Sequence, residues 1–486
     1  MKIDRKVYLI FLISFFIRAV FLSLTDNTCG DPAGKIIVAL EWLKHPSFIT
    51  YGFSFPFFHY LISFAIYCFD SPMISTRILS LVIGSLTIFP FYSLVCMLFD
   101  KKTAIYSSIF LSFLYHHILY STQTMNDSTF LFLVISSLFY FFKSLNLAHG
   151  ETKPIILSST FLLAAEMTRF EAWILIPFLI FFIASKKIFL NTFLFIVISL
   201  AFPVFWITGN YIGTGVFIPL ANININVHAQ EGFTILGRLL IYPYMIVKTM
   251  TPLAAVFAFV GLVMSFAKNV NRKLILLISV ELLFLISTVI VGTNAFPKPR
   301  YCLLVAILLI PFCILSIRAF LDKIPRSTSI AAICILVVSM LATYSYFYIS
   351  AKDELFPTTP SYVTEISTQL KSMKTNQEKV FIDSFNWWNS NIAILAEIDT
   401  DLLARVYAKP YNVIYTSKKV YKKREEGIIN YFDEEHPDYV IYEPGGVLSK
   451  WTGGNLENTI NSLSENKFER IFTSQKYVIL KSVGKK

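Results

Sequence analysis

Charged residues are scarce in this 486-residue chain, since they make up only 15% of it. Hydrophobic residues account for 55% and aromatic residues for 16%, and the mean hydropathy is +0.61. A soluble protein of this length does not need so much apolar surface. Apolar runs of ~20 residues, the length of a membrane-spanning helix, recur through the first part of the chain. The composition therefore predicts a polytopic α-helical membrane protein.

Motifs for several kinds of chemistry are also lacking. The six cysteines form no CxxC pair, which argues against a disulfide framework and a cysteine zinc site. The sequence contains no HEXXH, GxSxG, P-loop or GxGxxG pattern, and its seven histidines have no metal-ligand spacing. No cofactor is indicated, although a divalent metal stays open. The net charge of +11 is expected to come from basic residues on cytoplasmic loops. It therefore does not indicate nucleic acid as a partner.

Basic residues predict how the chain crosses the membrane. Lys2, Arg5 and Lys6 precede the first apolar run, so the N-terminus is expected in the cytoplasm. The aromatic segment 54–69 is short for a span, and we expect it to lie in the outer interface, because the later basic loops then all fall inside. About eleven spans follow: 7–24, 75–98, 103–121, 128–144, 154–168, 171–185, 188–209, 251–267, 273–292, 301–319 and 328–350, with an outer loop at 210–250.

The composition changes after Ser350. Strand-like runs such as KVFID (379–383) and PDYVIYE (437–443) alternate with helical stretches, which is typical of a small α/β domain. We therefore expect a transmembrane domain over 1–350, with outer juxtamembrane helices at about 32–69, and an extracytoplasmic α/β domain over 351–486.

A single acid, Asp31, follows the first span at the outer face and precedes an amphipathic pattern. A carboxylate in this place can act as a general base beside a lipid-linked substrate, or it can cap the helix that follows. Three further groups lie at the same face. Asp127 opens a span, and its alternative role is again a helix cap. Arg169 and Glu171 share a turn, where they mark a site or pair to hold the turn.

The third group consists of Lys298 and Arg300, at the outer end of a span. Outer-face cations depart from the positive-inside trend and are suited to binding phosphate, although snorkelling to lipid headgroups is the alternative. A base and cations on one face suit transfer from a lipid-phosphate donor. The acid removes a proton from an attacking hydroxyl, while the cations stabilise the leaving phosphate.

The ordered set of motifs resembles the GT-C glycosyltransferases, and most closely the protein O-mannosyltransferase and aminoarabinose-transferase group. The resemblance rests on GDPAGKIIVALEWL, the aromatic segment from Phe53, YSTQTMNDSTFLFL, AEMTRFEAW and PKPRYCLLVAILLIP. It implies a polyprenyl-phosphate sugar donor and an inverting reaction at the outer face. It places Asp31 on the catalytic acid, Asp127 on a second acid, and Arg169 and Arg300 on positions that face the donor phosphate.

The chain departs from that group in two places. A lysine often precedes the proline of the aromatic segment, but Phe55 stands here, so His59 or Lys298 are candidates to replace that phosphate contact. FNWWNS (385–390) has Asn389 where the WWD motif of oligosaccharyltransferases has aspartate. The acidic DxD or ExD pattern that this branch carries in its outer loops is absent from the expected outer loops before residue 350. Tyr301 and Glu171 complete the candidate residues, in acceptor-binding or structural roles.

The motifs predict a membrane-embedded transferase that acts on a protein, lipid or glycan acceptor, and the resemblance implies that it is hexosyl- or mannosyltransferase-like. Two other classes stay open. A transporter or flippase of lipid-linked saccharides predicts midplane charges, broken helices and internal repeats, whereas the polar residues here crowd one face. A non-catalytic scaffold predicts that Asp31, Arg169 and Arg300 can be replaced without loss.

Overall fold

The fold is known from a computed structural model of the chain. It describes residues 4–26, 30–46, 55–146, 151–185, 188–214, 234–290, 298–323, 338, 342, 357–383, 388–404, 414–415, 420–421, 432–433, 436–446, 449, 456–463 and 466–485. Cys29 and the expected span at 328–350 thus lie wholly or largely outside the described residues. Trp387 of FNWWNS and most of a further strand-like run, NVIYT (412–416), also lie outside them.

The chain divides into two units, each described here by itself. Unit 1 comprises residues 1–24, 48–58 and 77–356, and unit 2 comprises residues 25–47, 59–76 and 357–486. The division falls within two helices, α3 (Pro56–Phe69) and α4 (Pro72–Leu86). The boundary near residue 350 expected from the sequence stays a prediction.

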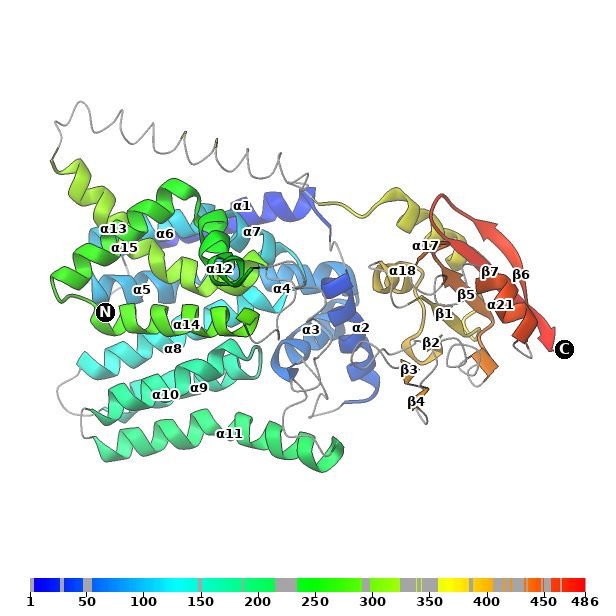
Figure 1. Ribbon diagram of the computed structural model, residues 1–486, viewed down its shortest axis with the longest axis horizontal. Coiled ribbons are helices and arrows are strands. Elements are labelled where there is room, and N and C mark those ends of the chain that lie inside the picture. The colour runs from blue at the N-terminus through cyan, green and yellow to red at the C-terminus, as the bar shows by residue number, and fades with distance from the viewer. Residues whose placement is uncertain are drawn as a thin grey trace. The chain divides into compact units, whose positions relative to one another are not determined.

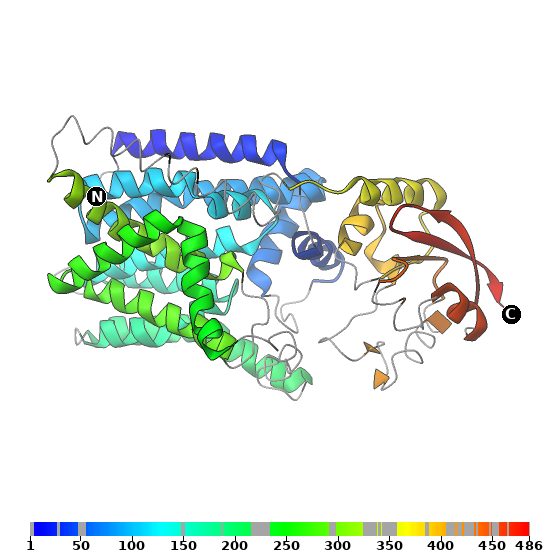
Figure 2. The same ribbon diagram turned by 45° about the horizontal axis from the view of Figure 1, so that its top comes forward.

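Unit 1 is a bundle of apolar helices that lie largely side by side (Figures 1 and 2). Its helices are α1 (Arg5–Leu24), α5 (Ile88–Leu98), α6 (Lys101–Phe113), α7 (Tyr115–Thr122), α8 (Asn126–Asn146), α9 (Thr152–Glu166), α10 (Glu171–Ala184), α11 (Phe189–Thr214), α12 (Ile235–Met250), α13 (Pro252–Ala267), α14 (Arg272–Ile290), the 3₁₀ helix η3 (Pro299–Cys302) and α15 (Leu303–Leu321).

Within the described residues, six helical segments are long and apolar enough to cross a membrane. The pair α12 and α13, bent by 111°, makes a seventh if it counts as one span. The chain is therefore a multi-pass membrane protein, as the composition predicts. The expected number of about eleven spans stays unconfirmed, because α9 and α10 have only 15 and 14 residues.

Two expectations for unit 1 are wrong in detail. The expected span 103–121 is broken at Leu114, whose extended backbone separates α6 from α7. The expected loop at 210–250 contains α12, which begins at Ile235 where the Thr234 hydroxyl caps it by accepting from the amide of Gly237. The helix was not predicted because the apolar pattern of that segment is interrupted by Arg238, Pro243 and Lys248.

Helix α15 is held by close packing against α13 and by an ion pair at its carboxyl-terminal end. A Cβ atom at Gly261 of α13 would lie 2.0 Å from the carbonyl oxygen of Phe312 in α15, so only glycine permits this approach. At the far end of α15, Arg318 donates to Asp100 across 2.7 Å. Arg300 and Arg318 thus lie at opposite ends of a helix roughly 27 Å apart.

The carboxyl-terminal part of unit 2 is built on a five-stranded mixed sheet with strand order β2-β1-β5-β7-β6. β1 pairs in parallel with β2 and β5, and β7 pairs antiparallel with β5 and β6. The strands are β1 (Val380–Ile382), β2 (Leu403–Ala404), β5 (Tyr439–Tyr442), β6 (Asn466–Thr473) and β7 (Val478–Lys485), and β3 (Ile414–Tyr415) pairs separately with β4 (Val420–Tyr421).

Alternation along the strands gives this sheet two buried faces. Phe381 and Val440 belong to one core, which includes Ile460 of α21 (Leu456–Leu463). Val380 and Ile441 belong to the other core, with α17 (Ser361–Met373) and α18 (Asn389–Leu395). Helices thus cover both faces of the sheet (Figure 1). The expected extracytoplasmic α/β domain over 351–486 stays a prediction.

Candidate functional site

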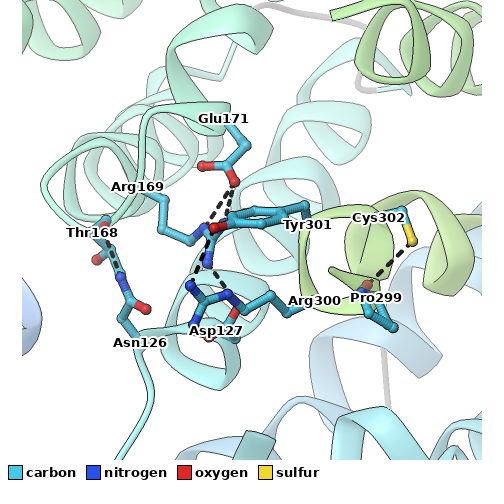
Figure 3. A network of polar contacts seen from close by, with 9 residues as sticks. All are labelled: Asn126, Asp127, Thr168, Arg169, Glu171, Pro299, Arg300, Tyr301 and Cys302. Atoms are coloured by element: carbon cyan, nitrogen blue, oxygen red, sulfur yellow. Dashed lines mark hydrogen bonds and ion pairs between the residues drawn. The ribbon is translucent and has the colours of Figure 1, made fainter. Parts of the chain in front are cut away.

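The expected cations and acids of unit 1 meet around the turn between α9 and α10. The turn carries Arg169, and Glu171 opens α10. Asp127 lies in the first turn of α8, and η3 brings Arg300 and Tyr301 to the same place. Figure 3 shows these side chains pointing toward one another from three separate parts of the chain.

Arg169 is the centre of the cluster. Its Nη1 donates to Asp127 Oδ1 at 2.7 Å, and its Nε donates to Glu171 Oε1 at 3.1 Å (Figure 3). Nη2 also donates to Glu171 Oε1. The amide of Asn126 donates to the carbonyl oxygen of Thr168 at 3.1 Å and joins the start of α8 to the turn. Asp127 and Glu171 are therefore both ion-pair partners of Arg169.

The ion pairs of Arg169 are largely buried. The side chains of Asp127, Arg169 and Glu171 are only 2%, 9% and 14% exposed. Although burial opposes the charge, the neighbouring carboxylates of Glu171 and Asp127 raise the pKa of the Arg169 guanidinium above its usual range. Arg169 thus stays cationic. Among the described residues, Asp127 Oδ2 has no hydrogen-bond partner, so this carboxylate is only partly satisfied.

Tyr301 brings the second arginine to the cluster. The guanidinium carbons of Arg169 and Arg300 lie 5.3 and 5.0 Å from the centre of the Tyr301 ring. Arg300 Nη2 also donates to the Tyr301 hydroxyl at 3.2 Å. Cation–π contacts of this length hold two like charges near one another. Lys298, in extended conformation, directly precedes η3.

An aromatic cluster fixes the turn from the other side. The Phe55 ring lies 4.2 Å from that of Phe170 and 5.3 Å from that of Trp206, measured between centroids. The backbone amide of Phe57 donates to the carbonyl oxygen of Met167 at 3.0 Å. Phe55 is only 2% exposed. The residue that replaces the lysine of the resembling group therefore packs in a core that supports the Arg169 turn.

Two further candidates, Asp31 and His59, belong to unit 2. Asp31 lies in the first turn of α2 (Gly30–Lys44), one residue inside the helix, where a negative charge is favourable. His59 lies in α3 and is only 3% exposed. Within the described residues, no group of three or more histidine, cysteine, aspartate or glutamate side chains is arranged to hold a metal ion.

Sequence reasoning missed the Phe55 cluster and a buried arginine in α1. Arg18 is fully buried, and it donates to the Ser121 hydroxyl at 2.9 Å and to the carbonyl oxygen of Ser14 at 3.0 Å. Arg18 could have been found from the sequence, because it is a lone arginine inside the first apolar run. The Phe55 cluster had no such signal, because its rings come from distant segments.

Known proteins with a similar sequence profile or a similar structure indicate the family to which the chain is related. A sequence profile described as dolichyl-phosphate-mannose-protein mannosyltransferase matches residues 44–208. ArnT from Cupriavidus metallidurans bound to undecaprenyl phosphate superimposes with a TM-score of 0.68 at 11% identity, over 98% of this chain and 97% of that chain. The chain has the GT-C fold. The resemblance predicted from the motifs is thereby confirmed.

A second GT-C structure is also similar. The Archaeoglobus fulgidus oligosaccharyltransferase in complex with Zn and sulfate has a TM-score of 0.59 at 14% identity, over 97% of this chain and 72% of that chain. No curated protein matches the sequence. The roles of the individual site residues remain those that the GT-C resemblance and the geometry suggest.

Proposed function

We propose that this GT-C protein is an inverting glycosyltransferase that moves a sugar from a polyprenyl-phosphate donor to an acceptor at the outer face of the membrane. The observation that carries the proposal is the pair of guanidiniums at Tyr301. Two arginines beside one ring, at the end of a membrane-spanning helix, suit the phosphate of a lipid whose tail lies in the bilayer.

Support for the donor class comes from the structural relatives. The ArnT structure contains undecaprenyl phosphate, and one structure of the Archaeoglobus fulgidus oligosaccharyltransferase AglB contains an inhibitory peptide and a dolichol-phosphate. The latter has a TM-score of 0.54 at 13% identity, over 94% of this chain and 72% of that chain. A mannosyl or hexosyl donor and a protein, lipid or glycan acceptor are parts of the proposal.

In this mechanism the two arginines have different tasks. Three of the five N–H groups of Arg169 donate to Asp127 and Glu171, which leaves two for a ligand within the described structure. Arg300, with Lys298 beside it in the chain, is the principal phosphate ligand. Arg169 holds Asp127 and Glu171 in place and, through Tyr301, supports Arg300.

The chemical step needs a base and a stabilised leaving group. Asp31 removes the proton from an acceptor hydroxyl, whose oxygen forms a bond to the anomeric carbon through an oxocarbenium-like transition state. The bond from that carbon to the phosphate oxygen breaks, and its electron pair stays on the phosphate. The leaving polyprenyl phosphate gains negative charge, which the arginines stabilise. His59 stays a candidate for the phosphate contact that a lysine makes in the resembling group, or for an acceptor-side or structural role.

The assay that tests this function follows label leaving the lipid. Purified protein in detergent is incubated with radiolabelled polyprenyl-phosphate sugars and a mixture of membrane acceptors, and the released label is measured. We expect release with wild type and with Asp322→Asn, a control at the far end of α15, but not with Asp31→Asn. Equal release by Asp31→Asn would sink the assignment of the base.

A transporter is the second candidate, and the bent pair α12 and α13 favours it, because broken helices are common in transporters. A transporter or flippase moves the donor and leaves it intact. Donor that crosses proteoliposome membranes without losing its sugar would replace the transferase proposal.

A further inference from the structure

Helix α2, which carries Asp31, is joined to the carboxyl-terminal part of unit 2 at three places. The first place precedes the helix. The backbone amide of Asp26 donates to the carbonyl oxygen of Pro357 at 2.9 Å, and the Asp26 carboxylate accepts from the amide of Thr359 at 2.9 Å. Two hydrogen bonds thus join the start of this segment to the start of the α/β domain.

The second place is the middle of α2. Ile37 is only 2% exposed and belongs to the same core as Val363, Ile366 and Val380, on the sheet face covered by α17 and α18. A Cβ atom at Gly34 would lie 3.9 Å from the Ser390 hydroxyl oxygen. The helix therefore packs closely on α18, and one of its own side chains completes the core of the domain.

The third place is the end of α2. Lys44 Nζ forms ion pairs with Asp399 and, at 3.1 Å, with Asp401. His45 Nε2 lies 3.5 Å from Asp401 Oδ1. These acids lie in and just before the 3₁₀ helix η4 (Thr400–Leu402), between α18 and β2. Contacts in the middle and at the end of α2 fix its position and its rotation, and the hydrogen bonds of Asp26 join the chain that precedes it to the same domain.

We infer that the α/β domain positions the catalytic base, because α2 and the sheet belong to one compact unit. Ile37, Gly34 and Lys44 are positioning residues that act through Asp31, and the domain is part of the catalytic apparatus. This inference rests on the proposed function, in which Asp31 is the base. Asp31 is six residues from Ile37, or roughly 9 Å along the helix. A shift of ~1 Å at a reacting group can cost about 100-fold in rate.

The test must separate positioning from stability. Ile37→Ala and Ile460→Ala each remove the same atoms from a fully or almost fully buried isoleucine in the same domain. Ile460 belongs to the core on the opposite sheet face, which does not include α2. Both variants should lower the thermal unfolding midpoint similarly. We expect kcat to fall about 100-fold only in Ile37→Ala, with the donor KM unchanged.

A milder pair keeps the test valid if Ile37→Ala fails to fold. Lys44→Ala removes the ion pairs to Asp399 and Asp401, whereas Lys371→Ala removes a pair to Glu397 that does not involve α2. Exposed pairs are weak, so Lys44→Ala should lower kcat by about two- to fivefold, Lys44→Arg should restore it, and Lys371→Ala should leave it unchanged.

Kinetics with the full-length protein and a radiolabelled polyprenyl-phosphate sugar decide the outcome. Equal kcat losses in Ile37→Ala and Ile460→Ala, or no kcat loss in both Ile37→Ala and Lys44→Ala, would overturn the positioning role. Asp31→Asn is measured in parallel. If Asp31→Asn is fully active, the proposed base is wrong. If Asp31→Asn is inactive while Ile37→Ala and Lys44→Ala both keep wild-type kcat, only the positioning inference is wrong.

Discussion

Arg169 donates a hydrogen bond of 2.7 Å to Asp127, which lies 42 residues earlier in the chain. The bond joins the turn between α9 and α10 to the first turn of α8. With Glu171, it encloses the guanidinium between two largely buried carboxylates. The end of α9 and the first turns of α8 and α10 are thereby held in one arrangement, and Tyr301 packs against the Arg169 guanidinium.

Replacing Arg169 should destabilise the protein strongly. Arg169→Ala leaves Asp127 and Glu171 buried without their counter-charge, and breaking a buried pair in this way costs ~3–5 kcal/mol. Thermal unfolding in detergent measures the loss. Arg272→Ala, at the start of α14, serves as the control with little expected change. Wild-type stability of Arg169→Ala would show that the ion pairs do not hold the turns.

Arg300→Ala should weaken donor binding and leave folding intact. A hydrogen bond to a charged group contributes ~1.5–3 kcal/mol, which corresponds to about 10- to 100-fold in Kd. Binding of radiolabelled polyprenyl phosphate provides the measurement. Arg318→Ala, at the other end of α15, should bind like wild type. An unchanged Kd in Arg300→Ala would remove this residue from the phosphate site.

Introducing a lysine at position 55 should not restore a phosphate contact. Phe55 is enclosed by the rings of Phe170, Trp173, Phe202 and Trp206, so Phe55→Lys buries an unpaired charge or expels the side chain and loosens the turn. We expect a lower unfolding midpoint and no gain in donor affinity. Phe69→Lys, at the exposed last residue of α3, the helix that Phe55 directly precedes, is the matched control. Tighter donor binding by Phe55→Lys would contradict the packing role.

The attachment of α2 should weaken in acid. A hydrogen bond from Lys44 holds the pKa of the Asp399 carboxyl below its usual range. A lowered folded-state pKa stabilises the folded state above the unfolded pKa of ~3.9, and this contribution is lost as the pH falls below that value. Thermal unfolding is measured between roughly pH 6 and pH 3, a range that includes that pKa. The acid-induced decrease of the unfolding midpoint should be smaller in Lys44→Ala than in wild type. Identical pH profiles would contradict this linkage.

Much of unit 1 could be predicted from the sequence, because long apolar runs and single charges are local signals. Asp127, Arg169 and Arg300 were identified as outer-face candidates for that reason. Their mutual contacts could not be predicted, since they depend on packing between helices far apart in sequence. Arg169 was expected to face the donor phosphate, and this role stays a prediction; the structure adds that its guanidinium donates to Asp127 and Glu171.

Unit 2 shows the same limit. β1, β5 and β7 correspond to apolar runs in the sequence, whereas β6 was missed because charged residues such as Lys467 and Glu469 alternate along it, as is usual for an edge strand. The membership of α2 in the carboxyl-terminal core depends on Ile37 packing against residues more than 300 positions later. No local pattern carries that information.

The most direct test of the whole account measures donor binding and donor consumption separately in wild type, Asp31→Asn and Arg300→Ala. The account predicts that wild type binds polyprenyl-phosphate sugar and releases its label, that Asp31→Asn binds without release, and that Arg300→Ala binds poorly. Release of label by Asp31→Asn at the wild-type rate would contradict it.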